Sequence, residues 1–216
     1  MKYGLIGASG RLGKEVIDVF SEQKHELVFT FDINGESFDK KPEILIDCSL
    51  PEVLEKSVGF VNQFKVPLII ATTGLTDENI KSLKLLAEKK PVVQSYNYSL
   101  GIQILLRLTE EANEKLKDWD VEITETHHRF KKDKPSGTAK MLENIFGDKK
   151  VNISSLRLGN VSGDHSVSFA SLGEVLSINH RALSRRTFAE GILRSAEFAL
   201  KKEKGFYTFT DVVFNK

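Results

Sequence analysis

The densest group of chemically active side chains lies in residues 125–138, which read Glu-Thr-His-His-Arg-Phe-Lys-Lys-Asp-Lys-Pro-Ser-Gly-Thr. Two of the five histidines of the chain are adjacent there, and four basic residues occupy the next six positions. Successive side chains on an extended backbone point to opposite faces, so His127 and His128 form a poor pair of ligands for one metal ion. They suit two separate tasks, proton donation and anion binding.

The end of the same segment is suited to binding a carboxylate. Ser136, Gly137 and Thr138 stand at a predicted helix start, where hydroxyl and N–H groups attract anions, and Lys131 adds a nearby cation. The segment therefore predicts a small, multiply negative substrate and one proton transfer. The alternative for a charge run of this kind is a solvated basic loop.

A glycine-rich loop provides a second, independent signal. Gly7-Ala8-Ser9-Gly10-Arg11-Leu12-Gly13 separates a predicted strand from a predicted helix, the context in which glycines let a backbone approach a pyrophosphate. Asp32 follows Gly13 by 19 residues, ends the next strand, and is placed to accept hydrogen bonds from the adenosine ribose. No arginine follows it directly to pair with a 2′-phosphate, which favours NADH over NADPH unless Arg11 or Lys41 reaches that phosphate. The alternative is a glycine turn that only connects strand to helix.

The elements that must position these residues follow an α/β pattern. Apolar strands are predicted at residues 2–6, 26–31, 44–46, 68–71 and 92–94, separated by helical patterns, which indicates a Rossmann-like parallel, doubly wound sheet. Ser49 is a predicted N-cap with Pro51 in the first helical turn, and Thr76 is a second predicted cap.

The pattern changes near Tyr98. A long amphipathic helix comes next, then an alternating strand at residues 120–126, a helix at 138–146 and strand-like runs at 151–158, 165–170 and 174–179. We interpret this part as a second α+β lobe with helices on one face of a mixed sheet. A helix near residues 188–199 and a closing segment at 206–209 return to the first lobe. The predicted domains are residues 1–98 with 184–216 for dinucleotide binding, and 99–183 for substrate binding and oligomerisation.

Composition limits the classes of function. The formal net charge is +1, so the chain has no global basic field for nucleic acid. No apolar run approaches the length of a membrane-spanning helix, and the start does not read as a signal peptide, so we expect a cytoplasmic protein without membrane partners. The only cysteine, Cys48, excludes an intrachain disulfide and a cysteine-based metal site, and no metal is expected.

Taken together, these residues resemble the 4-hydroxy-tetrahydrodipicolinate reductase (dihydrodipicolinate reductase) family almost from end to end. The most specific element is the E-x-H-H-x-x-K-x-D-x-P-S-G-T segment of the family, which residues 125–138 match throughout. Further matches lie at residues 7–13, 47–49, 72–74, 97–99, 163–165, 180–182 and 205–207. Leu12, Cys48 and Ala71 depart from the commonest family pattern, and all three belong to the predicted cofactor lobe.

The resemblance implies hydride transfer from NADH or NADPH into a cyclic, unsaturated imine with two carboxylates, in diaminopimelate and lysine biosynthesis. It implies His127 as proton donor and acceptor, Lys131 as a proton donor, and substrate contacts from His128, Gly137 and Thr138. The implied cofactor contacts are Gly7, Ala8, Ser9, Gly10, Arg11, Leu12, Asp32, Ala71, Thr72, Thr73, Ser95, Tyr96, Asn97 and Tyr98. Arg185 and Phe188 match residues near the nicotinamide in some members.

The family is typically tetrameric, which implies a homotetramer whose exposed strands within residues 151–179 are covered by partner subunits. Two alternatives remain open at this point. One is another two-lobed NAD(P)-dependent oxidoreductase, and the other is a dinucleotide-sensing protein without turnover.

Overall fold

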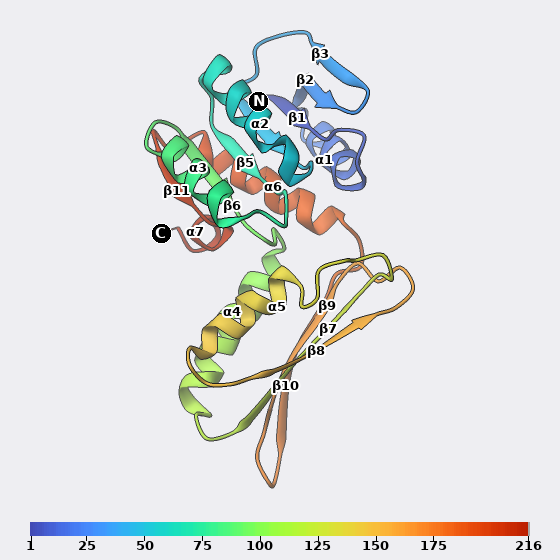
Figure 1. The fold of residues 1–216 in the computed structure, drawn as a ribbon, viewed down its shortest axis with the longest axis vertical. Helices are drawn as coiled ribbons and strands as arrows, with labels where there is room; N and C mark the ends of the chain where they lie inside the picture. Colours follow the sequence, from blue (N-terminus) through green and yellow to red (C-terminus); the bar gives the residue numbers. More distant parts are fainter. Residues whose placement is uncertain (216) are drawn as a thin grey trace. The chain divides into compact units, whose positions relative to one another are not determined.

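The computed structural model describes residues 1–215 (Figure 1). The chain divides into two compact units, Met1–Ser99 with the chain from Arg185 onward, and Leu100–Ser184. Each unit has its own sheet, and the predicted combination of a parallel α/β sheet with a second mixed sheet is confirmed. In the described part of the chain, no helix combines the length and the apolar character that crossing a membrane would require.

The first unit is built on a seven-stranded sheet with the order β11-β6-β5-β4-β1-β2-β3. Its strands are β1 (Lys2–Ile6), β2 (Glu26–Asp32), β3 (Gly35–Phe38), β4 (Ile44–Asp47), β5 (Leu68–Ile70), β6 (Pro91–Gln94) and β11 (Gly205–Tyr207). Every neighbouring pair is parallel except β2 and β3, which form an antiparallel hairpin at one edge. The chain runs from β1 to β2 on one side and later resumes at β4 on the other, so strand order reverses at β1, where loops of such sheets bind ligands.

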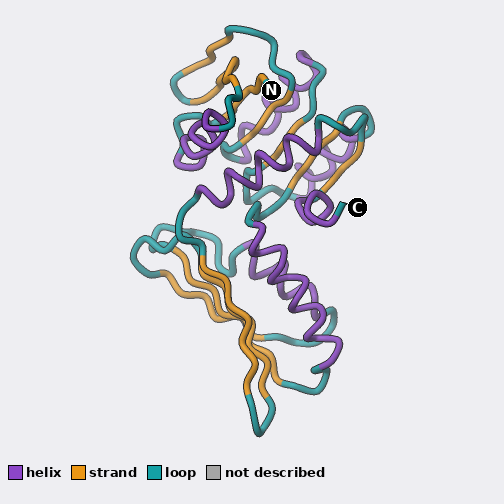
Figure 2. The backbone as a smooth tube through the Cα atoms, turned by 180° about the vertical axis from the view of Figure 1, so that it is seen from behind, coloured by secondary structure: helices purple, strands orange, loops and turns teal. Residues whose placement is uncertain are grey.

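Helices cover both faces of this sheet (Figures 1 and 2). They are α1 (Arg11–Glu22), α2 (Leu54–Phe64), α3 (Asp77–Ala87), α6 (Arg186–Ala199) and α7 (Phe209–Phe214). Alternate residues of each strand join different cores: Ile44 and Ile46 pack with α1, α6 and α7, whereas Leu45 packs with α2 and α3. Burial on both faces explains why the strands read as continuous apolar runs.

Of the two helix caps predicted from the sequence of this unit, one is confirmed and the other is wrong. The cap at Thr76 is confirmed, because its hydroxyl accepts a hydrogen bond from the backbone N–H of Asn79. The cap at Ser49 was wrong: its N–H and hydroxyl both donate to the carboxylate of Asp47 instead, and a 3₁₀ turn (Pro51–Val53) follows Leu50. Strand β3 was not predicted, because Gly35–Phe38 is exposed throughout and lacks an apolar pattern.

The second unit has a four-stranded sheet with the order β10-β9-β7-β8. Its elements are α4 (Leu100–Lys115), β7 (Asp120–His127), α5 (Gly137–Glu143), a 3₁₀ turn (Asn144–Phe146), β8 (Asn152–Arg157), β9 (Asp164–Ala170) and β10 (Val175–Arg181). Only β7 and β8 are parallel. Ile102 of α4, Leu142 of α5 and the strand residues Ile123, Val167 and Phe169 form its core.

Candidate active site

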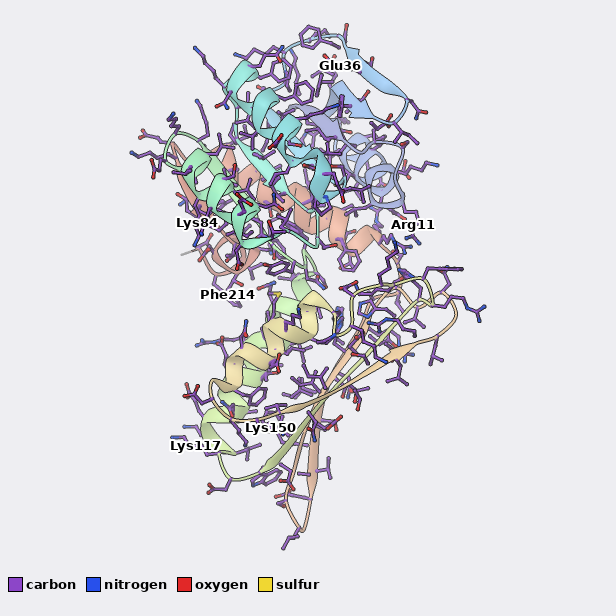
Figure 3. All side chains as sticks on the ribbon, viewed as in Figure 1. Arg11, Glu36, Lys84, Lys117, Lys150 and Phe214 are labelled. Atoms are coloured by element: carbon purple, nitrogen blue, oxygen red, sulfur yellow. The ribbon has the colours of Figure 1, made fainter. Side chains whose placement is uncertain are left out.

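The glycine loop of the first unit is packed against the helix that follows it. Gly7 has φ +83° and its N–H donates to the carbonyl of Phe31 at 2.8 Å. A Cβ on Gly13 would lie 2.2 Å from the carbonyl oxygen of Gly7, so only glycine allows this approach. Gly10 precedes α1 without a side-chain cap, and Arg11 is the first residue of the helix (Figure 3). The first N–H groups of α1 are therefore directed at a site suited to an anion.

Asp32 lies beside this loop because β1 and β2 are neighbours. Its carboxylate accepts hydrogen bonds from the backbone N–H of Asn34 at 2.7 Å and of Ser9 at 3.0 Å. These bonds, that of Asn34 first, lower the pKa of the carboxyl. An ionised acceptor thus stands next to the glycine loop.

A buried aspartate to which sequence reasoning gave no role of its own organises the neighbouring strand ends. Asp47, at the end of β4, accepts hydrogen bonds from the hydroxyls of Ser49 (2.5 Å), Ser57 (2.7 Å) and Thr72 (2.9 Å). Its backbone carbonyl also receives the N–H of Ala71 at 2.8 Å. The available signal was an aspartate closing an apolar strand, with hydroxyl residues at the ends of both this strand and the next.

The remaining predicted cofactor residues differ in burial. Thr73 and Tyr96 are exposed, Ala71 and Asn97 are half-buried, and Thr72 and Ser95 are buried. Tyr98 is also buried, and its hydroxyl donates to the carbonyls of Ile70 at 2.8 Å and Val93 at 3.1 Å. The side chain of Tyr98 therefore holds strands β5 and β6 together.

Three further positions in this unit were singled out from the sequence. Leu12 and Phe188 are half-buried against the core that α1, α6 and α7 share, and Arg185 immediately precedes α6. Burial raises the pKa of the Cys48 thiol, so this side chain is not a thiolate at neutral pH.

In the second unit, β7 places two site residues on one face. The strand alternates so that Ile123, Glu125 and His127 all point inward. Nδ1 of His127 lies 2.5 Å from Oε2 of Glu125. The two-residue alternation that places Val121 and Ile123 on one face continues to Glu125 and His127. It would have predicted from the sequence that these two side chains are neighbours.

Arg157, on the neighbouring strand β8, completes the contacts of Glu125. Its guanidinium donates to both carboxylate oxygens, with Nη1 2.9 Å from Oε2 and Nη2 2.8 Å from Oε1. Burial alone would raise the pKa of Glu125, but hydrogen bonds from Arg157, Ser155 and His127 outweigh burial and hold that pKa at about 2. Arg157 was missed by sequence reasoning, since only the pairing of β7 with β8 brings it here.

Two histidine rings meet at the end of this sheet. The ring of His165, on β9, lies 5.1 Å from that of His127 in an edge-on arrangement, and its Nε2 is 3.4 Å from the hydroxyl of Ser136. Burial lowers the pKa of His127, opposed by the hydrogen bond to Glu125. Burial, with the adjacent His127, lowers the pKa of His165 to about 3, so His165 is neutral. A Cβ on Gly163 would lie 3.2 Å from Nε2 of His127, which leaves little room for any other residue there.

The loop after β7 carries the remaining predicted residues. Lys131 is mostly buried and forms an ion pair with Asp133 at 2.7 Å, whereas Lys132 and Lys134 are exposed. His128 immediately follows β7, and its carbonyl accepts the N–H of Lys131 at 3.0 Å. This unequal burial of the lysines speaks against a purely solvated basic loop.

The helix that follows this loop begins as predicted. Ser136 caps α5 through a hydrogen bond from the N–H of Ala139 at 3.2 Å, and Gly137 and Thr138 form the first turn. The unit thus gathers a buried imidazole, a cation and a helix start. Within residues 1–215 no group of three or more His, Cys, Asp or Glu side chains is arranged to hold a metal ion.

Comparison with known proteins places the whole chain in one family. The family models for the N-terminal and C-terminal parts of dihydrodipicolinate reductase match residues 1–98 and 101–213. A protein of Thermosipho africanus named 4-hydroxy-tetrahydrodipicolinate reductase is 47% identical over 213 residues, which are 99% of this chain and 98% of that protein. A protein of the same name from Zymomonas mobilis is 38% identical over 246 aligned positions, gaps included, and the alignment covers 99% of this chain and 97% of that protein.

A solved structure agrees with these matches. Dihydrodipicolinate reductase from Paenisporosarcina sp. TG-14, with dipicolinate bound, has a TM-score of 0.79 over 98% of both chains at 22% identity, which shows the same fold. The resemblance inferred from the sequence is confirmed, and the chain belongs to the dihydrodipicolinate reductase family.

Proposed function

We propose that this protein is a 4-hydroxy-tetrahydrodipicolinate reductase, which forms tetrahydrodipicolinate with hydride from NADH or NADPH in the route to diaminopimelate and lysine. The observation that carries the proposal is the group formed by His127, Glu125 and Arg157 beside Lys131 and the start of α5. This arrangement offers one proton donor and several anion-binding groups, as reduction of a dicarboxylate ring requires.

The first unit is proposed to bind the cofactor. Gly7, Ala8, Ser9, Gly10, Arg11 and Leu12 would hold the pyrophosphate, and Asp32 would receive the ribose hydroxyls. Residues 71–73 and 95–98 would provide the remaining contacts, Tyr98 by positioning them from the core. When bound, the reduced nicotinamide supplies the hydride. Asp32, without a following arginine, favours NADH.

The second unit is proposed to bind the substrate and deliver the proton. Hydride addition to a conjugated imine leaves an electron-rich enamine that must be protonated. Because Nδ1 of His127 is directed at Glu125, the transferable proton would be the one that the imidazolium form carries on Nε2. Lys131 would polarise or protonate the ring, and His128, Gly137 and Thr138 would hold a carboxylate.

The free protein and the substrate complex differ in how readily His127 is protonated. Burial lowers the pKa of His127. A bound dicarboxylate adds negative charge near the ring and so favours the imidazolium. The substrate would therefore help to load the proton that it later receives.

The proposed homotetramer has support from exposed apolar residues in the second sheet. Val175 and Leu176 of β10 and Leu156 of β8 are exposed by 67%, 44% and 38%. A partner subunit that covers these strands would remove the apolar surface from water. The cytoplasm is the proposed location for a biosynthetic enzyme of this kind.

A coupled assay tests the reaction. NADH and NADPH oxidation is followed at 340 nm while a dihydrodipicolinate synthase supplies fresh substrate, and we expect oxidation that depends on the synthase. The ratio of kcat/KM for the two cofactors tests the preference for NADH. NADH binding without any oxidation would refute the proposal and favour a dinucleotide-sensing protein.

His127→Gln tests the proton donor. Loss of general-acid catalysis should lower kcat by about 10²–10⁴-fold, while the dissociation constant for NADH stays nearly unchanged because that site belongs to the other unit. Isothermal titration with NADH provides the control. A variant with near-normal kcat would exclude His127 as the donor.

A further inference from the structure

The carboxylate of Glu125 contacts three different parts of the second unit, although it is fully buried. Its oxygens form hydrogen bonds with the ring of His127 on the same strand, with both terminal nitrogens of Arg157 on β8, and with the N–H of Ser136 at 3.3 Å. Ser136 caps α5, so one carboxylate connects the proton donor with the helix start proposed to bind substrate. A group so placed can fix the relative positions of both.

Arg157 also forms several hydrogen bonds in this arrangement. Besides its two bonds to Glu125, Nη2 donates to the carbonyl of Asp133 at 2.6 Å and Nη1 to the carbonyl of Leu156 at 2.6 Å. Asp133 in turn pairs with Lys131. Arg157 therefore holds both the carboxylate behind His127 and the backbone of the loop that carries Lys131.

The chemistry of the pair explains what it would do for His127. A buried carboxylate without another cation would be neutralised by the ring that it contacts, which would keep His127 protonated. The bidentate guanidinium supplies the opposite charge instead, so the ionised Glu125 can accept the Nδ1–H of a neutral His127. The neutral ring must then have Nε2 unprotonated, and the proton gained at Nε2 is the one available for transfer.

We propose that Glu125 and Arg157 act as a positioning pair: Glu125 fixes the Nδ1–H tautomer and the orientation of His127, and Arg157 balances the charge of Glu125 and so limits its effect on the ring. Neither residue has to touch the reacting atoms. The inference deepens the function proposed above, and it rests on His127 being the proton donor.

The two charges should act on His127 in opposite directions. Glu125 raises the pKa of His127 and Arg157 lowers it. The titratable and charged groups around the ring are Glu125 on β7, Arg157 on β8, His165 on β9, and Lys131 and Asp133 in the following loop. His165 is neutral, and Lys131 lowers the pKa of His127 as Arg157 does, so Glu125 is the main group that raises it. Removing Glu125 and removing Arg157 should therefore shift that pKa in opposite directions.

The experiment uses the full chain with Glu125→Gln, Arg157→Gln and Arg157→Lys, and Arg107→Gln as the matched control. Arg107 lies in the same unit and forms an exposed ion pair with Glu110, so its loss changes net charge equally without reaching the site. Long-range ¹H–¹⁵N spectra of the histidine rings report tautomer and pKa directly, and His127→Gln assigns the signals.

We expect Glu125→Gln and Arg157→Gln to shift the pKa of His127 in opposite directions. Glu125→Gln should lower the pKa of His127 by about one unit or more and allow the Nε2–H tautomer, while Arg157→Gln should raise that pKa. The basic limb of kcat/KM should move with it, to lower pH in Glu125→Gln and to higher pH in Arg157→Gln. In Arg157→Lys, which keeps the positive charge, and in Arg107→Gln, the pKa of His127 should stay close to that of the parent protein. The KM for NADH should change in none of the variants.

The outcomes separate this inference from the proposed function. Shifts of the same sign in both variants, or an Arg157→Gln variant indistinguishable from Arg107→Gln, would overturn the positioning pair. If Glu125→Gln does not fold, the comparison of Arg157→Gln with Arg157→Lys still decides. Opposite shifts in the spectra, in a protein without reductase activity, would support the pair and refute the function instead.

Discussion

The closeness of the glycine loop to α1 makes Gly13→Ala a quantitative test of the proposed cofactor site. In an open helix position, alanine is more stable than glycine by about 0.8–1.0 kcal/mol. At Gly13 the added Cβ would meet the carbonyl oxygen of Gly7 at 2.2 Å and that of Ala8 at 2.8 Å. Both obstacles are backbone atoms, and ordinary contact at 3.4 Å lies 1.2 Å further out than the nearer one. The loop or the helix must therefore move.

Such a displacement should cost about 1–3 kcal/mol in the free energy of unfolding, as overpacking does elsewhere. For a chain of this length, each kcal/mol changes Tm by about 2–4 °C, so Tm should fall by about 2–12 °C. The backbone that would hold the pyrophosphate moves as well, so the dissociation constant for NADH should rise at least about tenfold, or 1.4 kcal/mol.

Gly59→Ala is the matched control. Gly59 lies within α2 of the same unit, and no atom stands within 4 Å of its added Cβ. Alanine there should raise Tm by about 2–4 °C and leave NADH binding unchanged. Thermal unfolding with isothermal titration measures both quantities. A Gly13→Ala protein as stable as Gly59→Ala, with unchanged NADH affinity, would refute the reasoning.

Three further predictions concern single side chains. Lys131→Met should lower kcat/KM by at least about tenfold, whereas Lys132→Met should change it little, because Lys131 is half-buried and ion-paired and Lys132 is exposed. Equal losses in the coupled assay would favour a solvated loop. Asp47→Asn should destabilise the first unit by about 1–3 kcal/mol in urea unfolding, because its amide nitrogen would face either the hydroxyl donor of Ser57 or those of Ser49 and Thr72. The exposed Asp39→Asn should have no measurable effect. The free energy of unfolding should fall as pH drops below 6.5, because His165 takes up a proton in the unfolded chain but not in the folded protein, where its pKa is about 3. Between pH 6 and 5, the slope of the unfolding free energy against pH, measured with urea, should be shallower by about 1.4 kcal/mol per pH unit in His165→Gln. Equal slopes in the two proteins would contradict this.

The pH argument has a second component at lower pH. The folded pKa of Glu125, about 2, lies below its ordinary value of 4.5, so this carboxylate stabilises the fold above pH 4.5. That stability is lost as pH falls from 4.5 towards 2 and amounts to about 3 kcal/mol. His165 and Glu125 therefore make the second unit sensitive to acid in two successive ranges.

Much of the candidate site was visible in the sequence because its signals are local. The glycine spacing, the cap at Thr76 and the start of α5 at Ser136 each depend on residues within a few positions of one another. The alternation in residues 120–126 marked β7 as a strand with one inward face. The adjacent histidines lie at the end of that strand, so their side chains could be predicted to point to opposite faces.

Other features depended on which strands are neighbours. Asp47 contacts Thr72 across 25 positions because β4 pairs with β5. Arg157 reaches Glu125 across 32 positions because β8 lies parallel to β7 in the register that opposes His127 and Arg157. Pairing between distant strands depends on side-chain packing over whole elements, so no short pattern in residues 151–158 indicated the role of Arg157.

The sequence by itself determined the α/β class and the family, and it supplied the residues proposed to handle the proton and the phosphates, because helix starts, turns and strand alternation are set by near neighbours. The tertiary structure alone decided which charges surround them. It buried Glu125, placed Arg157 on both of its oxygens, kept His165 neutral and separated Lys131 from Lys132 and Lys134. Desolvation and charge proximity arise only when distant segments pack together, and these two effects set the protonation of His127.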